Sequence, residues 1–373
     1  MRIMFTTVPV LGHLLPMAPL AAAARRAGHD VLVVSGVDVE LECKRLGLPF
    51  TQAGPSVAVS TAAHRPDDRA DATPEQRIAA DIANLFGPAA QRRAEELLPL
   101  AMHWRPDVVV HDPSELAGAI AAACTGARHV VHGLGMWSAQ VWPMLEPAYA
   151  RLADRWRVRP SAFLDALYVD PFPRALQPGG PADFRHVQPL RPVAPPAAPA
   201  LLDLPRDPVY LTLGTIFNDA ADVFGAVLDG LIALPHNVLV TAGPGADPAR
   251  LGNWPPRVRI TDFVPQEQLL PHCRLVISHG GAGTVTGALR HGLPQLVLPR
   301  GADNFHNAAA VHAAGAGLWL PPDEVAPDAV AGAVARLLDE PTFAEAAGRV
   351  AAEIAGMPAP DEVLDRILSG SLR

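Results

Sequence analysis

The segment RLVISHGGAGT, residues 274–284, is the part of the sequence that most clearly indicates a fold. Residues 274–277 are mostly apolar and β-branched, as in a buried parallel strand, and residues 285–289 continue as the start of a helix. The glycines therefore lie on a strand-to-helix turn. Such a turn directs unpaired backbone N–H groups and the positive end of the helix dipole toward one point, where an anion, most often phosphate, can bind. A tight turn whose glycines serve only backbone geometry is the other interpretation.

Two side chains in this turn can add to an anion site. Thr284 can offer a hydroxyl, and His279 a ring N–H or, when protonated, a positive charge. The glycines beside them have no Cβ, so a ligand can approach the backbone closely.

Length and composition predict two soluble domains. The chain has 373 residues, of which 49% are hydrophobic, enough for two sizeable cores. Its net charge of −8 argues against a nucleic-acid partner, which requires a basic surface. The three cysteines are far apart and show no zinc-binding spacing, so we expect no metal site and a reducing, cytoplasmic location. No uninterrupted apolar run reaches the roughly 18 residues of a membrane span.

Strand and helix patterns alternate in both halves of the chain. This predicts an α/β protein with two doubly wound, Rossmann-like domains, whose carboxyl edges face each other across a cleft. We place the N-terminal domain at residues 1–190, a Pro- and Ala-rich linker at 191–207 and the C-terminal domain at 208–373. The last helix is expected to pack back on the N-terminal domain.

A histidine and an aspartate follow neighbouring strands of the predicted N-terminal sheet. A strand at residues 2–7 leads into a turn at 8–15 that contains His13, and a helix is expected from Met17 to Ala27. Asp112 ends the buried strand PDVVVHD, residues 106–112. If the two side chains are within hydrogen-bond reach, the aspartate can hold the imidazole in the tautomer that a general base needs. A lone histidine is otherwise usually structural. The first turn has one glycine, so NAD or FAD binding is not expected.

Further candidate ligand groups follow strands of the C-terminal domain. Thr215 lies in the turn after the first strand. Phe263 can stack on a base and Val264 can pair with it through its backbone, although Phe263 taken on its own favours a core position. Asp303 and Asn304 offer acceptors and donors that suit sugar hydroxyls, unless Asp303 merely caps the following helix.

Aromatic residues gather between positions 136 and 149. Trp137, Trp142 and Met144 can line an apolar acceptor pocket. Ordinary packing of a helix is the other interpretation.

Taken together, these segments resemble the inverting nucleotide-sugar glycosyltransferases of the GT-B fold, and within them the branch that decorates bacterial polyketide and other antibiotic aglycones. The resemblance covers essentially the whole chain. It is carried by residues 12–16 (GHLLP), 106–112 (PDVVVHD), 210–215 (YLTLGT), 263–266, 279–284 (HGGAGT) and 299–307. The family pattern often has Asp-Gln where this chain has Asp303-Asn304, and many relatives have Trp at the position of Phe263.

The resemblance implies transfer of a deoxysugar or other hexose from a dTDP- or UDP-linked donor to a hydroxyl or aromatic carbon of a small apolar aglycone, such as a polyketide. His13 would be the catalytic base and Asp112 its partner. No metal and no cofactor would be required, and a homodimer is possible. By the same resemblance, the nucleotide base of the donor would lie on Phe263 and Val264, and its sugar on Asp303 and Asn304. The donor diphosphate would be bound by Thr215, His279, Gly281, Ala282, Gly283 and Thr284.

Two other functions fit the same fold. A nucleotide-sugar epimerase would share the phosphate turn but would need acid–base carboxylates around the sugar. A catalytically silent partner that activates a true transferase would have no use for both His13 and Asp112.

Overall fold

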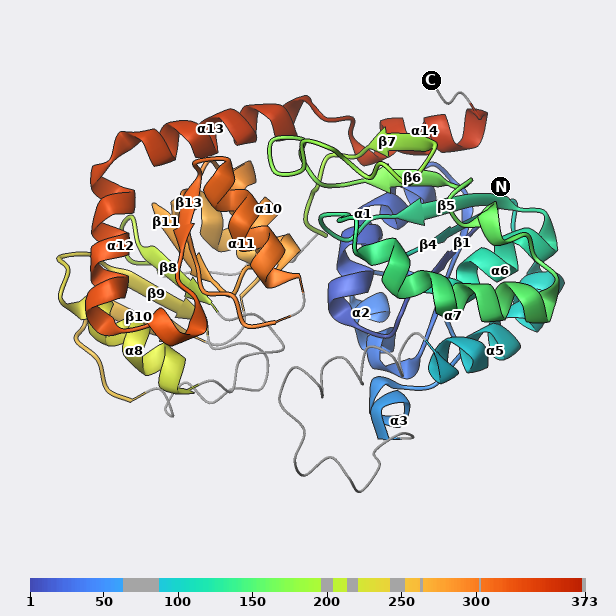
Figure 1. Cartoon of the computed structure of the whole chain (residues 1–373), viewed down its shortest axis with the longest axis horizontal. Coiled ribbons are helices and arrows are strands. Elements are labelled where there is room, and N and C mark those ends of the chain that lie inside the picture. Colours follow the sequence, from blue (N-terminus) through green and yellow to red (C-terminus); the bar gives the residue numbers. More distant parts are fainter. Residues whose placement is uncertain are drawn as a thin grey trace. The chain divides into compact units, whose positions relative to one another are not determined.

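Each half of the chain folds around its own parallel β-sheet. The computed structural model describes residues 1–62, 87–195, 204–212, 221–241, 252–261, 264–301 and 303–370 (Figure 1). Its contacts divide the chain into a first unit, Met1–Pro171, Gly179–Pro196 and Pro358–Arg373, and a second unit, Phe172–Pro178 and Ala197–Met357.

The first unit contains a seven-stranded sheet in the order β3-β2-β1-β4-β5-β6-β7, with every neighbouring pair parallel. The strands are β1 Arg2–Thr6, β2 Asp30–Ser35, β3 Phe50–Gln52, β4 Val108–His111, β5 Arg128–His132, β6 Leu167–Asp170 and β7 His186–Pro189. Strands β2 and β3 lie on one side of β1, and β4 to β7 lie on the other, so the strand order switches between β1 and β4. Ligands bind at such a switch point in open α/β sheets.

Helices cover this sheet on both faces, so its central strands, such as β4 with the sequence VVVH, are buried and largely apolar. The helices of the unit are α1 Leu11–Arg26, α2 Glu40–Arg45, α3 Val57–Ala62, α5 Pro88–Trp104, α6 Leu116–Thr125, α7 Val141–Trp156 and α14 Pro360–Ser369, with 3₁₀ turns at Val37–Val39 and Pro160–Ala162. Alternate residues of one strand enter different cores. Met4 packs with helices α5 and α6, whereas Ile3 and Phe5 pack with α1 and α14.

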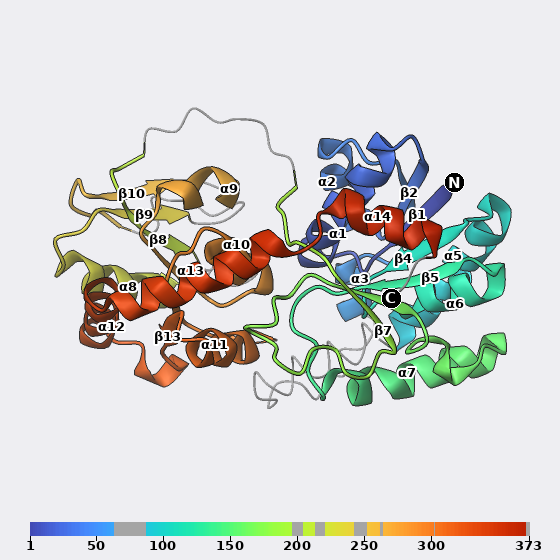
Figure 2. The ribbon, with the colours of Figure 1, turned by 90° about the horizontal axis from the view of Figure 1, so that it is seen from above.

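The C-terminal helix α14 packs on α1 of the first unit (Figure 2). Val363, Leu364 and Ile367 enter the same apolar core as α1. At the surface Arg26 contacts Asp361 with an N–O distance of 2.9 Å. The short segment Phe172–Pro178 belongs instead to the second unit, where the Glu353 carboxylate accepts its backbone N–H groups.

The second unit contains a six-stranded parallel sheet in the order β10-β9-β8-β11-β12-β13. Counted within the unit this is 3-2-1-4-5-6, the Rossmann order, with its switch point between β8 and β11. The strands are β8 Val209–Thr212, β9 Val238–Thr241, β10 Val258–Thr261, β11 Leu275–Ser278, β12 Gln295–Val297 and β13 Gly317–Trp319. The helices are α8 Ala221–Ile232, α9 Gln266–Leu269, α10 Ala282–Arg290, α11 Asn304–Ala313, α12 Pro327–Asp339 and α13 Pro341–Gly356, with 3₁₀ turns at Leu270–His272 and Pro322–Glu324.

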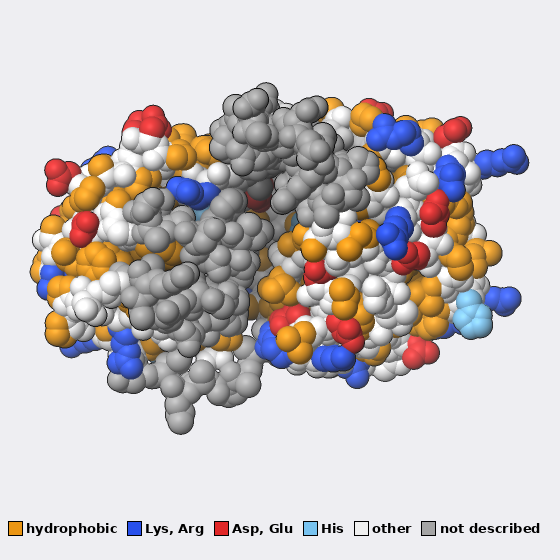
Figure 3. Space-filling model, turned by 90° about the horizontal axis from the view of Figure 1, so that it is seen from below, with side chains coloured by type: hydrophobic (Ala, Val, Ile, Leu, Met, Phe, Trp, Pro, Cys, Tyr) orange, Lys and Arg blue, Asp and Glu red, His pale blue; other side chains and the backbone are white. Residues whose placement is uncertain are grey.

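Acidic and basic side chains of the described residues are interspersed on the face drawn in Figure 3, among many apolar ones.

Among the described helices, none combines the length and the apolar character needed to cross a bilayer.

Candidate active site

His13 lies in the first turn of α1, at the carboxyl edge of the first sheet. The predicted turn over residues 8–15 and the predicted helix start at Met17 are wrong, because α1 begins at Leu11. Pro16 and Pro19 lie inside the helix, where each removes one backbone hydrogen bond. Burial of the apolar face, which includes Leu14 and Met17, outweighs this loss, since packing supplies most of the stability of a helix in a protein.

Asp112 follows β4, next to the end of β1, and its side chain is fully buried. Its carboxylate accepts four hydrogen bonds. The donors are the Thr7 hydroxyl (2.9 Å), Val8 N–H (2.9 Å), Ser114 N–H (2.7 Å) and His13 Nδ1 (3.1 Å). Burial acts to raise the pKa of Asp112, but the neighbouring His13 and the hydrogen bonds outweigh it and lower the pKa to about 2. The carboxylate is therefore ionised at neutral pH.

The ionised carboxylate fixes the tautomer of His13. An ionised carboxylate can only accept hydrogen bonds, so the imidazole proton lies on Nδ1, 3.1 Å from Asp112 Oδ1. The lone pair of Nε2 is then able to accept a proton. The His13 side chain is 22% exposed, so a ligand can reach it. The structure thus brings together the two residues predicted from adjacent strand ends, in the arrangement of a general base and its orienting acid.

A buried ion pair lies behind Asp112 and was not predicted. Arg93 of α5 contacts Glu115 at 2.7 Å, and the two side chains are 2% and 0% exposed. The Glu115 backbone N–H donates to the Asp112 carbonyl oxygen at 3.0 Å, which links the pair to the end of β4. Burial raises the pKa of Glu115 to about 7, against the effect of Arg93 and with a further contribution from Asp112. Spacing in the sequence contains no signal for this contact, because Arg93 lies on α5 and Glu115 at the N-cap of α6, and only the tertiary fold brings the two together.

In the second unit, the turn after β11 presents an open helix N-terminus. Gly281 is the N-cap of α10, and no side chain caps the helix there. The first hydrogen bond in this turn runs from Val285 N–H to the Gly281 carbonyl, so helix geometry leaves the N–H groups of residues 282–284 without helical acceptors. A Cβ at Gly281 would lie 2.7 Å from His279 Nε2, whereas one at Gly283 would meet open space. The backbone can therefore be approached closely at the end of the helix dipole.

Thr284 and His279 are both neutral donors at this turn. Thr284 Oγ1 accepts a hydrogen bond of 3.0 Å from Gln266 Nε2, which leaves the hydroxyl hydrogen to be donated elsewhere. Burial lowers the pKa of His279 to about 4, although Asp303 acts to raise it. The sequence left open whether this imidazole is charged, and the structure favours the neutral form at neutral pH. Gln266 was not predicted as a site residue, although it lies in the segment 263–266.

Asp303 is at the N-cap position of α11, but its side chain makes no capping hydrogen bond. Its carboxylate instead accepts from Asn307 Nδ2 at 2.9 Å and from Asn304 Nδ2 at 3.4 Å. The simple capping role considered from the sequence is therefore not observed. Asp303 is exposed, while Asn304 and Asn307 are buried beneath it.

Two of the predicted donor residues, Thr215 and Phe263, lie outside the described residues. Val264, the other residue predicted to bind the nucleotide base, is buried and packs with Leu269 and Leu270. Its side chain therefore belongs to the core, and base pairing through its backbone stays a prediction.

The two predicted acceptor tryptophans lie in packed aromatic contacts, whereas Met144 is exposed. Trp137 is buried, donates from Nε1 to Asp183 at 2.6 Å and packs edge-on against Phe184. Trp142 stacks on Phe163 at 4.9 Å between centroids, whereas Met144 is 49% exposed. The two tryptophans thus occupy the positions expected from ordinary packing, and the acceptor role stays a prediction.

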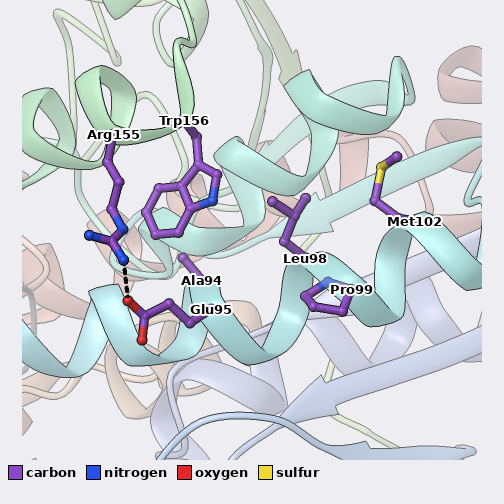
Figure 4. Close-up of a pocket in the computed structure, with 7 residues that line it drawn as sticks. All are labelled: Ala94, Glu95, Leu98, Pro99, Met102, Arg155 and Trp156. Atoms are coloured by element: carbon purple, nitrogen blue, oxygen red, sulfur yellow. Dashed lines mark hydrogen bonds and ion pairs between the residues drawn. The ribbon is translucent and has the colours of Figure 1, made fainter.

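One open groove of about 660 Å³ lies elsewhere on the first unit, between α5 and α7 (Figure 4). Arg155 points toward Glu95 across it, with an N–O distance of 2.8 Å, and stacks over Trp156. None of the predicted site residues lines it. Within the described ranges, no three His, Cys, Asp or Glu side chains gather as a metal site requires.

The chain is similar to solved structures of glycosyltransferases. The chain matches the glycosyltransferase SnogD from Streptomyces nogalater with a TM-score of 0.80 and 28% identity, over 100% of this chain and 99% of that one. It matches the spinosyn rhamnosyltransferase SpnG, solved with thymidine diphosphate, with a TM-score of 0.82 and 26% identity, over 99% and 100% of the two chains. The two parallel-sheet units therefore form a GT-B fold, as predicted.

Sequence comparison then identifies the family. Models of the N-terminal and C-terminal domains of erythromycin biosynthesis protein CIII-like proteins match residues 22–168 and 225–369. The elloramycin glycosyltransferase ElmGT of Streptomyces olivaceus is 34% identical over 98% of this chain and 97% of its own length. The chain belongs to the erythromycin biosynthesis protein CIII-like family and is a natural-product glycosyltransferase. These relatives give no support to an epimerase or to a silent partner.

Proposed function

We propose that the chain moves a sugar from a nucleoside-diphosphate donor to a hydroxyl group of an apolar aglycone, by a single displacement that inverts the anomeric carbon and needs neither a metal ion nor another cofactor. The observation that carries the proposal is the His13–Asp112 hydrogen bond of 3.1 Å, which leaves His13 Nε2 able to take a proton. SpnG has been solved with thymidine diphosphate and with the spinosyn aglycone, which supports a thymidine-diphosphate donor and an aglycone acceptor.

In the first unit, His13 acts on the acceptor. Nε2 takes the proton of the acceptor hydroxyl as its oxygen forms a bond to the anomeric carbon. The imidazole becomes positively charged in this step, and the ionised Asp112 stabilises that charge through Nδ1–H. The glycosidic bond to the diphosphate breaks on the opposite face of the sugar, so the configuration inverts.

In the second unit, the leaving diphosphate gains negative charge as this bond breaks. The N–H groups at the start of α10 face such an anion with about half a positive charge from the helix dipole. The Thr284 hydroxyl and a neutral His279 ring N–H add directional donors. Asp303 and Asn304 would hold the sugar hydroxyls.

The test is a reaction panel with the purified chain. TDP- and UDP-hexoses are incubated with a set of polyketide aglycones, with and without EDTA, and products are identified by mass spectrometry and by NMR of the anomeric configuration. We expect an inverted glycoside whose formation is insensitive to EDTA. A retained configuration, or loss of activity in EDTA that metal restores, would overturn the mechanism. A second sugar nucleotide formed from donor alone would indicate epimerase activity.

A homodimer stays a prediction from the resemblance, and a cytoplasmic location stays a prediction from the cysteine content. Light scattering coupled to size-exclusion chromatography tests the first of these.

A further inference from the structure

One buried side chain, that of Asn307, joins the turn assigned to the diphosphate to the carboxylate assigned to the sugar. Asn307 lies on α11 and is 0% exposed. Its Nδ2 donates to the Gly280 carbonyl oxygen at 2.9 Å and to Asp303 Oδ2 at 2.9 Å. An amide nitrogen carries two hydrogens, so both bonds can form together, and both partners are acceptors, which fixes the direction of the amide.

The turn sits so close to α11 that only glycine fits at position 280. Gly280 has a φ of +90°, a conformation that other residues rarely adopt. A Cβ there would lie 2.6 Å from Val297 Cγ1 and 3.2 Å from the Asn304 carbonyl oxygen. The Asn307 bond therefore holds a backbone that already packs on the first turn of α11.

Asn307 is also the stronger of the two restraints on Asp303. The Asp303 side chain is exposed, and an exposed carboxylate without partners would sample several rotamers. The contact from Asn304 Nδ2 is 3.4 Å long, near the limit of a hydrogen bond, whereas that from Asn307 Nδ2 is 2.9 Å. Asn307 thus fixes the orientation of the carboxylate and the position of the turn at once.

We propose that Asn307 is a positioning residue that couples the diphosphate turn to the Asp303 carboxylate. It holds the two at a fixed separation, so that the diphosphate and the sugar of one donor molecule can contact both at once. The inference rests on the proposed function, because that function assigns the turn and Asp303 to the donor. Asn307 itself is buried and acts only through Gly280 and Asp303.

The variant that isolates this role is Asn307→Asp. It keeps the shape of the side chain but replaces the two donor hydrogens by an acceptor that faces two other acceptors. Asn307→Ser, which keeps a single donor, is the second variant in case the first does not fold. Gln188→Glu is the control, because Gln188 is also buried and its amide donates to a backbone carbonyl, that of Pro189 at 2.7 Å, but it lies in β7 of the first unit.

Three measurements on the full chain separate positioning from simple destabilisation. Calorimetry gives the affinity for thymidine diphosphate and for TDP-glucose, steady-state kinetics gives kcat and the donor KM, and hydrogen exchange gives the protection of amides 280–283 without any ligand. For Asn307→Asp we expect affinity for both nucleotides about tenfold weaker or more, a raised donor KM and faster exchange in the turn. Asn307→Ser should fall between this variant and the wild type, and Gln188→Glu should keep wild-type nucleotide affinity and wild-type exchange in the turn.

If Asn307→Asp behaved like Gln188→Glu, with wild-type nucleotide affinity and wild-type exchange in the turn, the inference would be overturned and the proposed function would stay intact. A wild-type chain that binds neither thymidine diphosphate nor uridine diphosphate would overturn the donor assignment, and the inference with it.

Discussion

Replacing Asp112 by asparagine is the sharpest test of the base assignment, because it keeps the shape of the side chain and removes one acceptor. In the wild type, Oδ1 accepts from His13 Nδ1 and Ser114 N–H, and Oδ2 accepts from the Thr7 hydroxyl and Val8 N–H. In either orientation the new NH₂ group faces a backbone N–H of fixed direction, that of Ser114 at the Oδ1 position or that of Val8 at the Oδ2 position. Neither orientation of the amide can therefore satisfy all four donors.

The catalytic effect follows from the tautomer of His13. If the NH₂ group takes the place of Oδ1, Nδ1 must accept a hydrogen bond, and the ring proton moves to Nε2. That nitrogen can then no longer take the acceptor proton. We expect turnover to fall by about 10²–10⁴-fold, the contribution of a general base.

The stability effect follows from the pKa of Asp112. A decrease from 3.8 to about 2 on folding corresponds to a contribution of about 2 kcal/mol to stability at neutral pH. The pKa is lower in the folded state, so this contribution is complete above pH 3.8 and is lost as pH falls toward 2. Asp112→Asn should therefore be less stable than the wild type at pH 7 by roughly this amount, and the difference should shrink in acid.

Kinetics with a hydroxyl acceptor, calorimetry with thymidine diphosphate and urea unfolding between pH 7 and pH 3 measure these effects together. Donor binding should be preserved, because the groups assigned to the diphosphate belong to the other unit. Wild-type turnover in Asp112→Asn would refute the base assignment. Loss of nucleotide binding in parallel with turnover would show that the variant damages the whole chain.

Three further changes probe the remaining parts of the site. His13→Ala should lower kcat by about 10²–10⁴-fold while thymidine diphosphate still binds by calorimetry, and full turnover would remove His13 from the mechanism. Thr284→Val deprives both Gln266 and the diphosphate of a hydroxyl, so the calorimetric Kd for thymidine diphosphate should rise about tenfold; an unchanged Kd contradicts this role. Arg93→Met leaves Glu115 buried without its cation and should cost about 3–5 kcal/mol in urea unfolding, whereas a loss below about 1 kcal/mol would show that the pair is replaceable.

The central strands of both sheets could be predicted from the sequence, while the edge of the first sheet could not. Strands β4 and β11 are continuous apolar runs because they are buried on both faces. β3 and β7 lie at the two ends of their sheet, and the latter, with the sequence HVQP, contains polar residues and a proline. Such a segment has no hydrophobic period to detect, since neighbouring strands rather than its own sequence make it a strand.

The contacts of the site differ in the same way: some could be predicted from topology or from spacing in the sequence, and others depend on the tertiary fold. The meeting of His13 with Asp112 followed from topology, because parallel strands carry their following loops to one edge of the sheet. Asn307 was missed although it lies four residues after Asp303, on the same face of the helix, which is a detectable spacing. Gln266 lies 18 residues from its partner Thr284, and no helical or strand period relates the two positions.

The two units place different kinds of groups around the reaction that we propose: an anion beside His13, and uncharged donors at the turn that contains His279. Asp112 is a buried anion at neutral pH, and the mechanism that we propose uses it to stabilise the cation that His13 becomes when it takes the acceptor proton. The groups that we assign to the diphosphate are uncharged: the N–H groups of α10, a hydroxyl, and an imidazole whose pKa burial lowers to about 4. Neutral dipoles stabilise charge that develops in the transition state, yet they hold the fully charged diphosphate product less tightly than a buried cation would. A neutral His279 therefore favours both departure of the leaving group and release of the product.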